Sequence, residues 1–330
     1  MRRREFLFAL GGSSLLPLAA GARPQASMPR VVMYSPTEPT ASMREGSANR
    51  YIRTLFAEMR HLGLIEGRTI MIERYGLETS DVRSKATISA IVESHPDLIF
   101  VVGVGGLFKQ ATSTIPIVAF SLDPVREGLI KSFAHPGGNV TGVSFNPERP
   151  IHGKRIALLR EMFPGLQKLA FLGTRWALDT DLSEVRAAAD AQGIQLTSCL
   201  IDVPTSEVIY RNAIAKARDD GANGVLVALD GTFVDHAIVV DQIAAAGLPA
   251  IYPFAEFVVS GGLMSYATDL VELNKRMASD MRDILGGTSP EDIPFYQATK
   301  FELVINLKAA KALSLNAPTA LLAAADEIIE

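Results

Sequence analysis

The sequence predicts an α/β protein made of two Rossmann-like lobes, each a parallel sheet covered on both faces by helices. Short apolar runs alternate with longer segments of helical periodicity along most of the chain. The apolar runs are unbroken, which is typical of parallel strands buried on both faces. The alternation stops at Pro147–Pro150 and then starts afresh without a low-complexity linker. With 330 residues, each of the two units can bury a core of its own.

The N-terminus has the layout of an export signal, which we exclude from the fold. Met1–Ala26 combines a basic start, an apolar middle and small residues where a signal peptidase can cut. Arg3–Leu7 resembles the twin-arginine export signature, and Arg23 near the cut site fits the same route. An ordinary secretory signal is the alternative, whereas a membrane anchor would need ~20 apolar residues. We expect a periplasmic mature protein, exported by the twin-arginine route.

In the first half, five strands alternate with helices. Ala48–Leu62 carries apolar residues at helical spacing, and Gly63 follows as its C-cap. Leu98–Val102 is too short for a helix and stops at Gly103. The predicted strands are Arg30–Ser35, Thr69–Arg74, Leu98–Val102, Ile115–Phe120 and Val140–Phe145, and the predicted helices are Ala48–Leu62, Ser80–Ser94, Lys109–Ser113 and Val125–Phe133.

The second half repeats this alternation and ends in a helical tail. Asp269–Leu285 has strong helical periodicity. The predicted strands are Leu169–Gly173, Gln195–Ile201, Gly224–Leu229, Ala250–Phe254 and part of Gly261–Thr268. The predicted helices are Lys154–Met162, Asp181–Gln192, Ser206–Asp219, Phe233–Ala246, Glu256–Val259, Asp269–Leu285, Leu307–Leu313 and Pro318–Ile329.

Two loops at the carboxyl ends of neighbouring strands carry the first candidate binding groups, because ligands of parallel sheets sit at that edge. The backbone N–H groups of Gly105 and Gly106 can bind a carboxylate or phosphate, or the glycines can simply form a turn. Ser121 and Asp123 follow the next strand. Asp123 stands before Pro124, so it is either a ligand contact or a helix N-cap.

Composition excludes several function classes. A net charge of −4 without clustered basic residues in the mature chain argues against nucleic-acid binding. The five histidines have no metal-ligand spacing, the lone Cys199 lies in an alternating apolar run, and we expect neither metal nor cofactor. Gly103-x-Gly105 with the later Asp123 resembles a dinucleotide fingerprint, but Phe108 occupies the third glycine position. An α/β oxidoreductase binding a dinucleotide at Gly103–Gly106 is therefore the alternative to a non-catalytic binding protein.

Several strings in fixed order resemble the ABC transporter substrate-binding protein family related to the tryptophan-binding TrpX proteins. They are Gln110–Val118, Asp123–Val125, Pro136–Gly142, Glu256–Val258, Gly261–Tyr266 and Thr299–Lys308. The resemblance implies a type I periplasmic binding protein, with one lobe at 28–142 plus 263–287, the other at 143–262 plus 288–330, and a ligand cleft between them. It implies a monomer that delivers an amino acid or related small polar or aromatic solute to an ABC permease and its ATPase, and that meets the membrane only through the permease. A ligand-sensing protein for a membrane kinase is a further alternative.

In this arrangement, residues at the strand ends of both lobes are expected to contact the ligand. Trp176 can stack on a planar ligand or hold a cation, and Arg175 can pair with a carboxylate. Asp230 can pair with an ammonium group or cap a helix. The predicted ligand-binding set is Ser35, Thr37, Gly105, Gly106, Ser121, Asp123, Arg175, Trp176, Asp230, Tyr252, Phe254 and Glu256.

Overall fold

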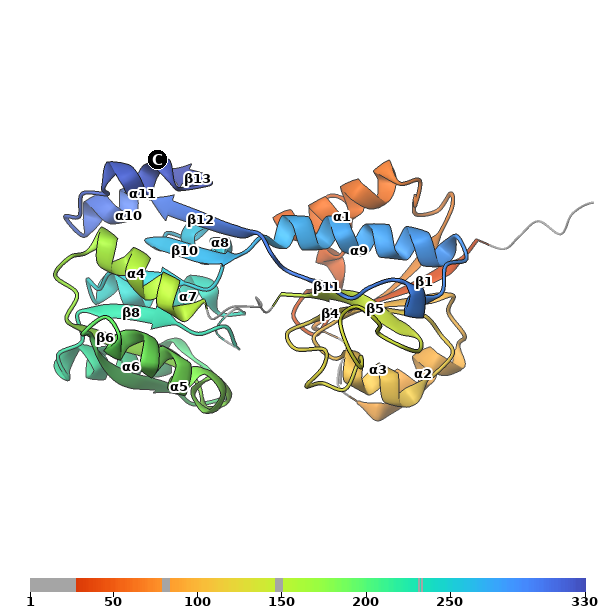
Figure 1. Cartoon of the computed structure of the whole chain (residues 1–330), viewed down its shortest axis with the longest axis horizontal. Coiled ribbons are helices and arrows are strands. Elements are labelled where there is room, and N and C mark those ends of the chain that lie inside the picture. The colour runs from red at the N-terminus through yellow and green to blue at the C-terminus, as the bar shows by residue number, and fades with distance from the viewer. Residues whose placement is uncertain (1–27, 79–83, 146–150, 231, 233) are drawn as a thin grey trace, which may run out of the picture.

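The computed structural model describes residues 28–78, 84–145, 151–230, 232 and 234–330. These residues form two α/β lobes that lie side by side (Figure 1). Each lobe has its own sheet with helices on both faces, as the sequence predicts. The export signal at 1–26 lies outside the described residues.

The first lobe has a six-stranded sheet in the order β11-β5-β4-β3-β1-β2, in which all pairs are parallel. The strands are β1 Arg30–Tyr34, β2 Met71–Tyr75, β3 Leu98–Val102, β4 Ile117–Ser121, β5 Val140–Ser144 and β11 Tyr296–Gln297; the helices are α1 Arg50–His61, α2 Lys85–Glu93, α3 Gly105–Ala111 and α9 Leu270–Leu285, with 3-10 turns at Thr40–Ser42 and Pro290–Asp292.

Strand β1 shows how this sheet buries both of its faces. Val31 and Met33 point into the core beneath α1 and α9, whereas Val32 and Tyr34 point into the core beneath α2 and α3. Successive side chains alternate across a strand, so an unbroken apolar run serves two cores at once.

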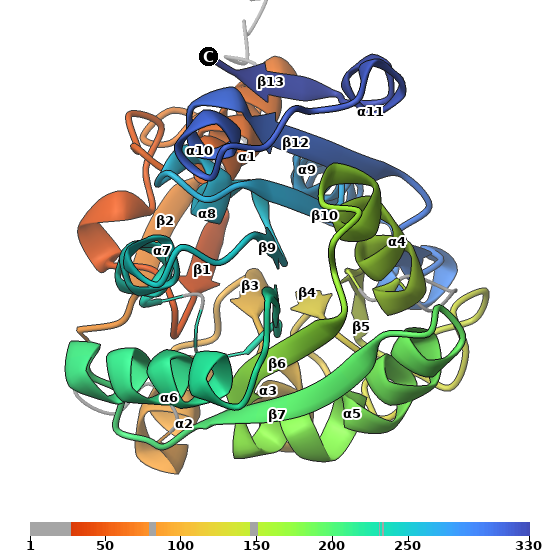
Figure 2. The same cartoon turned by 90° about the vertical axis from the view of Figure 1, so that its left-hand side faces the viewer.

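The second lobe has a seven-stranded sheet in the order β13-β12-β10-β9-β8-β6-β7 (Figure 2). Its pairs are parallel except β10 with β12. The strands are β6 Lys168–Thr174, β7 Gln195–Ile201, β8 Gly224–Val227, β9 Ala250–Tyr252, β10 Met264–Thr268, β12 Phe301–Asn306 and β13 Glu327–Ile329; the helices are α4 His152–Met162, α5 Arg175–Asp190, α6 Glu207–Asp219, α7 His236–Ala245, α8 Ala255–Val259, α10 Leu307–Ala312 and α11 Thr319–Ala323.

The chain passes between the lobes at different places from those predicted. Strand β10 pairs with β9 and β12 and so belongs to the second sheet, although 263–287 was assigned to the first lobe. Strand β11 pairs with β5 and belongs to the first sheet, although 288–330 was assigned to the second lobe. The later two crossings therefore lie between β10 and α9 and between β11 and β12.

Two predicted helices are wrong. Val125–Phe133 is a series of turns, because Gly128 adopts a φ of +71°, which a continuing right-handed helix does not permit. In the tail, α11 ends at Ala323, and Glu327–Ile329 forms β13 beside β12 instead of continuing the helix. The start of the predicted helix Ser80–Ser94 lies outside the described residues, and α2 begins at Lys85.

Candidate ligand-binding cleft

A cavity of about 350 Å³ lies between the lobes at the carboxyl ends of the central strands. This is a usual size for a small-molecule site. Most of its wall is aromatic or aliphatic, and both lobes contribute. The lining residues are Ser35, Thr37, Glu38, Asn49, Tyr51, Ile52, Phe100, Val102, Gly103, Phe120, Leu122, Glu127, Phe145, Trp176, Leu229, Asp230, Phe254, Leu270, Asn274 and Met277.

The first lobe supplies a paired aromatic surface. Phe120 in β4 and Phe145 just after β5 are neighbours across parallel strands, and their rings stack with centroids 4.8 Å apart and planes 18° apart. Helix α9 adds Asn274 and Met277, which are three residues apart and so share one helix face.

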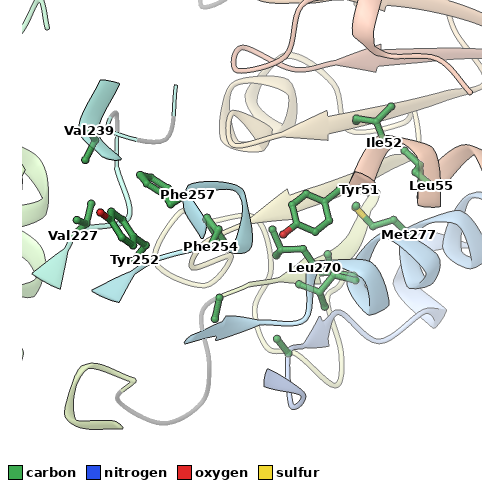
Figure 3. Packing of buried hydrophobic residues seen from close by; sticks show 14 of the residues in the cluster. Tyr51, Ile52, Leu55, Val227, Val239, Tyr252, Phe254, Phe257, Leu270 and Met277 are labelled. Atoms are coloured by element: carbon green, nitrogen blue, oxygen red, sulfur yellow. The ribbon is translucent and has the colours of Figure 1, made fainter. Parts of the chain in front are cut away.

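The second lobe faces this surface with an aromatic residue from each of two elements. Trp176 lies in the first turn of α5 and is 49 % exposed. Phe254 precedes α8, and Figure 3 shows it on the side of the second lobe that faces Tyr51 and Leu270 of the first. A flat solute between the lobes would therefore meet rings from both sides.

Asp230 joins two loops of the second lobe at the cleft. Its Oδ2 accepts a hydrogen bond from the backbone N–H of Thr174 at 2.5 Å, and its Oδ1 accepts one from the N–H of Thr232 at 2.9 Å. The carboxylate remains partly exposed and lines the cavity. Asp230 thus positions the residues before α5 and is also available to a solute.

Glu38 is the corresponding carboxylate of the first lobe. Asn49 Nδ2 donates a hydrogen bond of 2.6 Å to Glu38 Oε1, while Asn49 Oδ1 caps α1 by accepting from the N–H of Tyr51. Burial raises the pKa of Glu38, and the hydrogen bond from Asn49 acts in the opposite direction.

Polar contacts link the lobes at the first turn of α1. The hydroxyl of Tyr51 donates to Glu256 Oε2 at 3.0 Å, and Arg50 forms ion pairs with Glu302 at 2.8 Å and Glu327 at 3.1 Å. Burial raises the pKa of Glu256 to about 7. Burial also raises the pKa of Glu302, against the effect of Arg50. We call these contacts the Arg50–Tyr51 bridge.

Five residues of the predicted set line the cavity, namely Ser35, Thr37, Trp176, Asp230 and Phe254. The hydroxyls of Ser35 and Thr37 lie 3.3 Å apart in the loop after β1. Whether these five bind a ligand stays a prediction. Trp176 was expected in a loop, but it lies on a helix.

The predicted glycine-loop and β4-loop residues do not line the cavity. Gly105 and Gly106 begin α3 instead of forming a bare loop, and a Cβ on Gly105 would come within 3.2 Å of Leu129, so close packing accounts for that glycine. Ser121 is buried, and Asp123 Oδ1 accepts from the backbone N–H of Arg126, which makes it a turn cap.

The other three predicted residues lie elsewhere. Arg175 is exposed at the start of α5 and does not line the cavity. Tyr252 is buried in the second lobe, stacked on Phe257 at 5.3 Å (Figure 3). Glu256 lines a neighbouring hollow at the rim, together with Arg50.

The sequence offered signals for some lining residues that were missed. Asn274 is a polar residue on the buried face of the strongly periodic α9, and its exposed fraction is only 6 %. Phe100, Phe120 and Phe145 belong to predicted strands, and a strand pattern does not distinguish a core wall from a cleft wall.

Among the described residues, no group of three or more His, Cys, Asp or Glu side chains is placed to hold a metal ion. A bilayer-spanning helix is likewise not found in that part of the chain.

Comparison with known proteins extends over most of the chain. A curated tyrosine-binding protein of Clostridioides difficile is 24 % identical over 257 residues, which are 77 % of this chain and 73 % of that protein. A Streptococcus pneumoniae ABC domain in complex with L-Trp superimposes with a TM-score of 0.76 at 20 % identity, covering 92 % of this chain and all of that one.

A conserved domain protein of Vibrio cholerae also gives a TM-score of 0.76, at 22 % identity over 91 % of this chain and 99 % of that one. These structures share the two-lobed fold of type I periplasmic binding proteins. The sequence profile of the ABC transporter substrate binding protein family matches residues 61–329. The chain therefore belongs to the ABC transporter substrate-binding protein family.

Proposed function

We propose that this chain is the solute-binding component of an ABC import system, which holds an amino acid or a related aromatic solute between its lobes and delivers it to a permease. Proteins of this family are extracytoplasmic and bind solutes; they are not enzymes. The observation that carries the proposal is the cavity of about 350 Å³ with aromatic rings on both sides.

The composition of the wall supports an aromatic or apolar solute body. Phe120 and Phe145 are already stacked with planes 18° apart, so they offer a flat surface without rearrangement. Rings of this kind favour offset stacking or edge contacts with another ring. The similar proteins named for tyrosine binding and for a complex with L-Trp point to the same class of solute.

A thermal-shift screen of the purified mature protein tests the proposal. The panel comprises amino acids, amines, nucleobases and organic acids. A cleft ligand at a hundred times its dissociation constant should stabilise the fold by about 2.7 kcal/mol. Trp176→Ala should reduce that shift, whereas Trp176→Phe should retain part of it. A panel with no stabilising solute would contradict the proposal.

We also propose export by the twin-arginine route, on the basis of Arg3 and Arg4 within the N-terminal signature. Replacing both residues by Lys should abolish export, and fractionation of cells that express the two precursors measures this. Undiminished delivery of the Lys variant would show that the general secretory pathway is used.

A further inference from the structure

The charged groups on the cleft wall are all of one sign. Glu38, Glu127 and Asp230 line the cavity, and none of the described lining residues is Lys, Arg or His. No ion-pair partner exists for any of these three carboxylates among the described residues. Each lobe contributes carboxylates to the wall, since Glu38 follows β1 of the first lobe and Asp230 follows β8 of the second.

The hydrogen-bond donors of the wall are largely committed to protein acceptors. Asn49 Nδ2 donates to Glu38, Asn274 Nδ2 donates to the backbone carbonyl of Leu270 at 2.8 Å, and Tyr51 donates to Glu256. The Ser35–Thr37 hydroxyl pair and the indole N–H of Trp176 are the other side-chain donors, and they are neutral. The side chains of the cleft thus offer mainly acceptors and negative charge to a solute.

We infer that the solute carries a cationic nitrogen and no carboxylate, so that it is an aromatic or apolar amine and not an α-amino acid. The inference rests on the proposed function and names the chemical class that the cleft selects. An ammonium group would form charge-assisted hydrogen bonds with Glu38 and Asp230, and the surrounding rings can add cation–π attraction. A carboxylate that entered the cleft would lose its hydration and find no cation on the wall to pair with. It would also be repelled by the three carboxylates of the wall.

Cations that lie outside this wall define the competing outcome. Arg50 and Arg53 line the neighbouring hollow, which shares Thr37, Glu38 and Asn49 with the cavity. Arg175 is exposed at the start of α5, and Arg126 is exposed in the turn after β4. If any of these side chains moved into the cleft on ligand binding, it could hold the carboxylate of an amino acid. Matched compounds that differ only in the carboxylate distinguish this outcome from the inference.

Calorimetric titration of the full mature protein with such compounds is the test. Tryptamine is compared with L-tryptophan, tyramine with L-tyrosine, and phenethylamine with L-phenylalanine; indole-3-propionate is the acid without an amine. At least one amine should bind ten times or more as tightly as its amino acid, and indole-3-propionate should not bind. The inference would be overturned if each amino acid bound at least as tightly as its matched amine, or if none of the three amines bound.

Glu38→Gln removes one of the two first-lobe charges, leaving Glu127, and keeps an oxygen that accepts from Asn49. It should weaken binding of the preferred amine by tenfold or more. Asp219→Asn, which removes an exposed carboxylate at the end of α6, is the matched control and should change nothing. Equal affinities in Glu38→Gln and the unaltered protein would count against the inference. If amino acids bind instead, the proposed solute-binding function still stands; it fails only if the complete solute screen yields no cleft ligand.

Discussion

The hydroxyl of Tyr51 in the first lobe donates a hydrogen bond of 3.0 Å to the carboxylate of Glu256 in the second. The other oxygen of Glu256 is buried without a hydrogen-bond partner, so this carboxylate depends on Tyr51. Arg50, the preceding residue, pairs with Glu302 and Glu327 of the same lobe. The first turn of α1 therefore contacts the second lobe through two neighbouring residues, and Tyr51 also lines the cavity.

Tyr51→Phe should weaken ligand binding while retaining the ring that lines the cavity. The change removes the bond to Glu256, and above about pH 7, where that carboxylate is ionised, a hydrogen bond to it contributes about 1.5 to 3 kcal/mol. We expect roughly a tenfold or greater loss of affinity in calorimetric titration. Tyr75→Phe, in a residue of β2 that lies outside the cleft, is the control. Equal affinities in the two variants would show that the bond does not favour the liganded form.

Arg50→Met should lower affinity by a smaller factor. Both of its ion pairs are partly exposed, and pairs of this kind contribute about 0.2 to 1 kcal/mol each, so their joint removal should lower affinity by roughly twofold to thirtyfold. Salt should reduce the difference from the unaltered protein. Arg60→Met, on the same helix, breaks an exposed pair with Glu45 inside one lobe. If both variants lose affinity equally, the effect belongs to α1 and not to the bridge between lobes.

Trp176 should report ligand binding through its own fluorescence. It is the only tryptophan of the chain, and it is half exposed on the cleft wall. A bound solute would remove water from the indole, so saturation should shift the emission maximum to shorter wavelength. The titration midpoint should match the calorimetric dissociation constant. An unchanged spectrum at saturation would place the ligand away from Trp176.

Asp280 should make the fold less stable as pH rises toward neutrality. Its side chain on α9 is fully buried, and burial raises its pKa from 3.8 to about 7 despite the ion pair with Arg276 at 3.0 Å. Between these values the folded state binds more protons than the unfolded state, so the free energy of unfolding decreases with rising pH. This stabilisation is complete below the ordinary pKa and is lost as pH passes about 7.

Asp280→Asn should therefore flatten the pH profile. The slope contributed by one proton is at most about 1.4 kcal/mol per pH unit, and chemical denaturation between the two pKa values measures it. Glu256, whose pKa is also raised to about 7, should leave part of the slope in place. Asp219→Asn serves as the exposed control. A profile of Asp280→Asn that parallels the unaltered protein would show that Asp280 does not carry the effect.

The periodicity of the sequence was sufficient to predict the two-lobed fold. Runs such as Leu98–Val102 are buried on both faces of the sheet, so nearly every residue in them must be apolar. The sequence shows this directly. Where the prediction failed, the deciding interaction was distant in sequence. Glu327–Ile329 is a strand because it pairs with β12. Strand β10 belongs to the second lobe because it pairs with β9 of that lobe.

The predicted residues that line the cavity all lie within three residues of a strand end, as Asp230 does. Tyr252 and Phe254 are two residues apart, so a strand pattern would place both on one face. In the structure β9 ends at Tyr252, which stacks on Phe257 in the core, while Phe254 lines the cavity. Asn274 reaches the cleft from a helix that follows β10, so no strand-end rule could have found it.

Ligand-driven closure of the lobes is the last prediction, and it follows from the division of the site. Phe120 and Asn274 belong to the first lobe, whereas Trp176 and Asp230 belong to the second, so a solute touches all of them only when the lobes are close. Such a solute binds the closed form better than the open one, and this difference in affinity shifts the population. To move a protein from mostly open to mostly closed, the ratio of the two affinities must reach about 10⁴.

Small-angle scattering with and without a confirmed ligand measures closure directly. The radius of gyration should fall on saturation. In Tyr51→Phe, which lacks the bond between Tyr51 and Glu256, the fall should require more ligand than in the unaltered protein. Tyr75→Phe should behave as the unaltered protein does. If the radius does not change although calorimetry shows full occupancy, the receptor is rigid. A permease then could not distinguish its loaded and empty forms by the approach of the lobes, and recognition would have to rest on the ligand or on a local change at the rim.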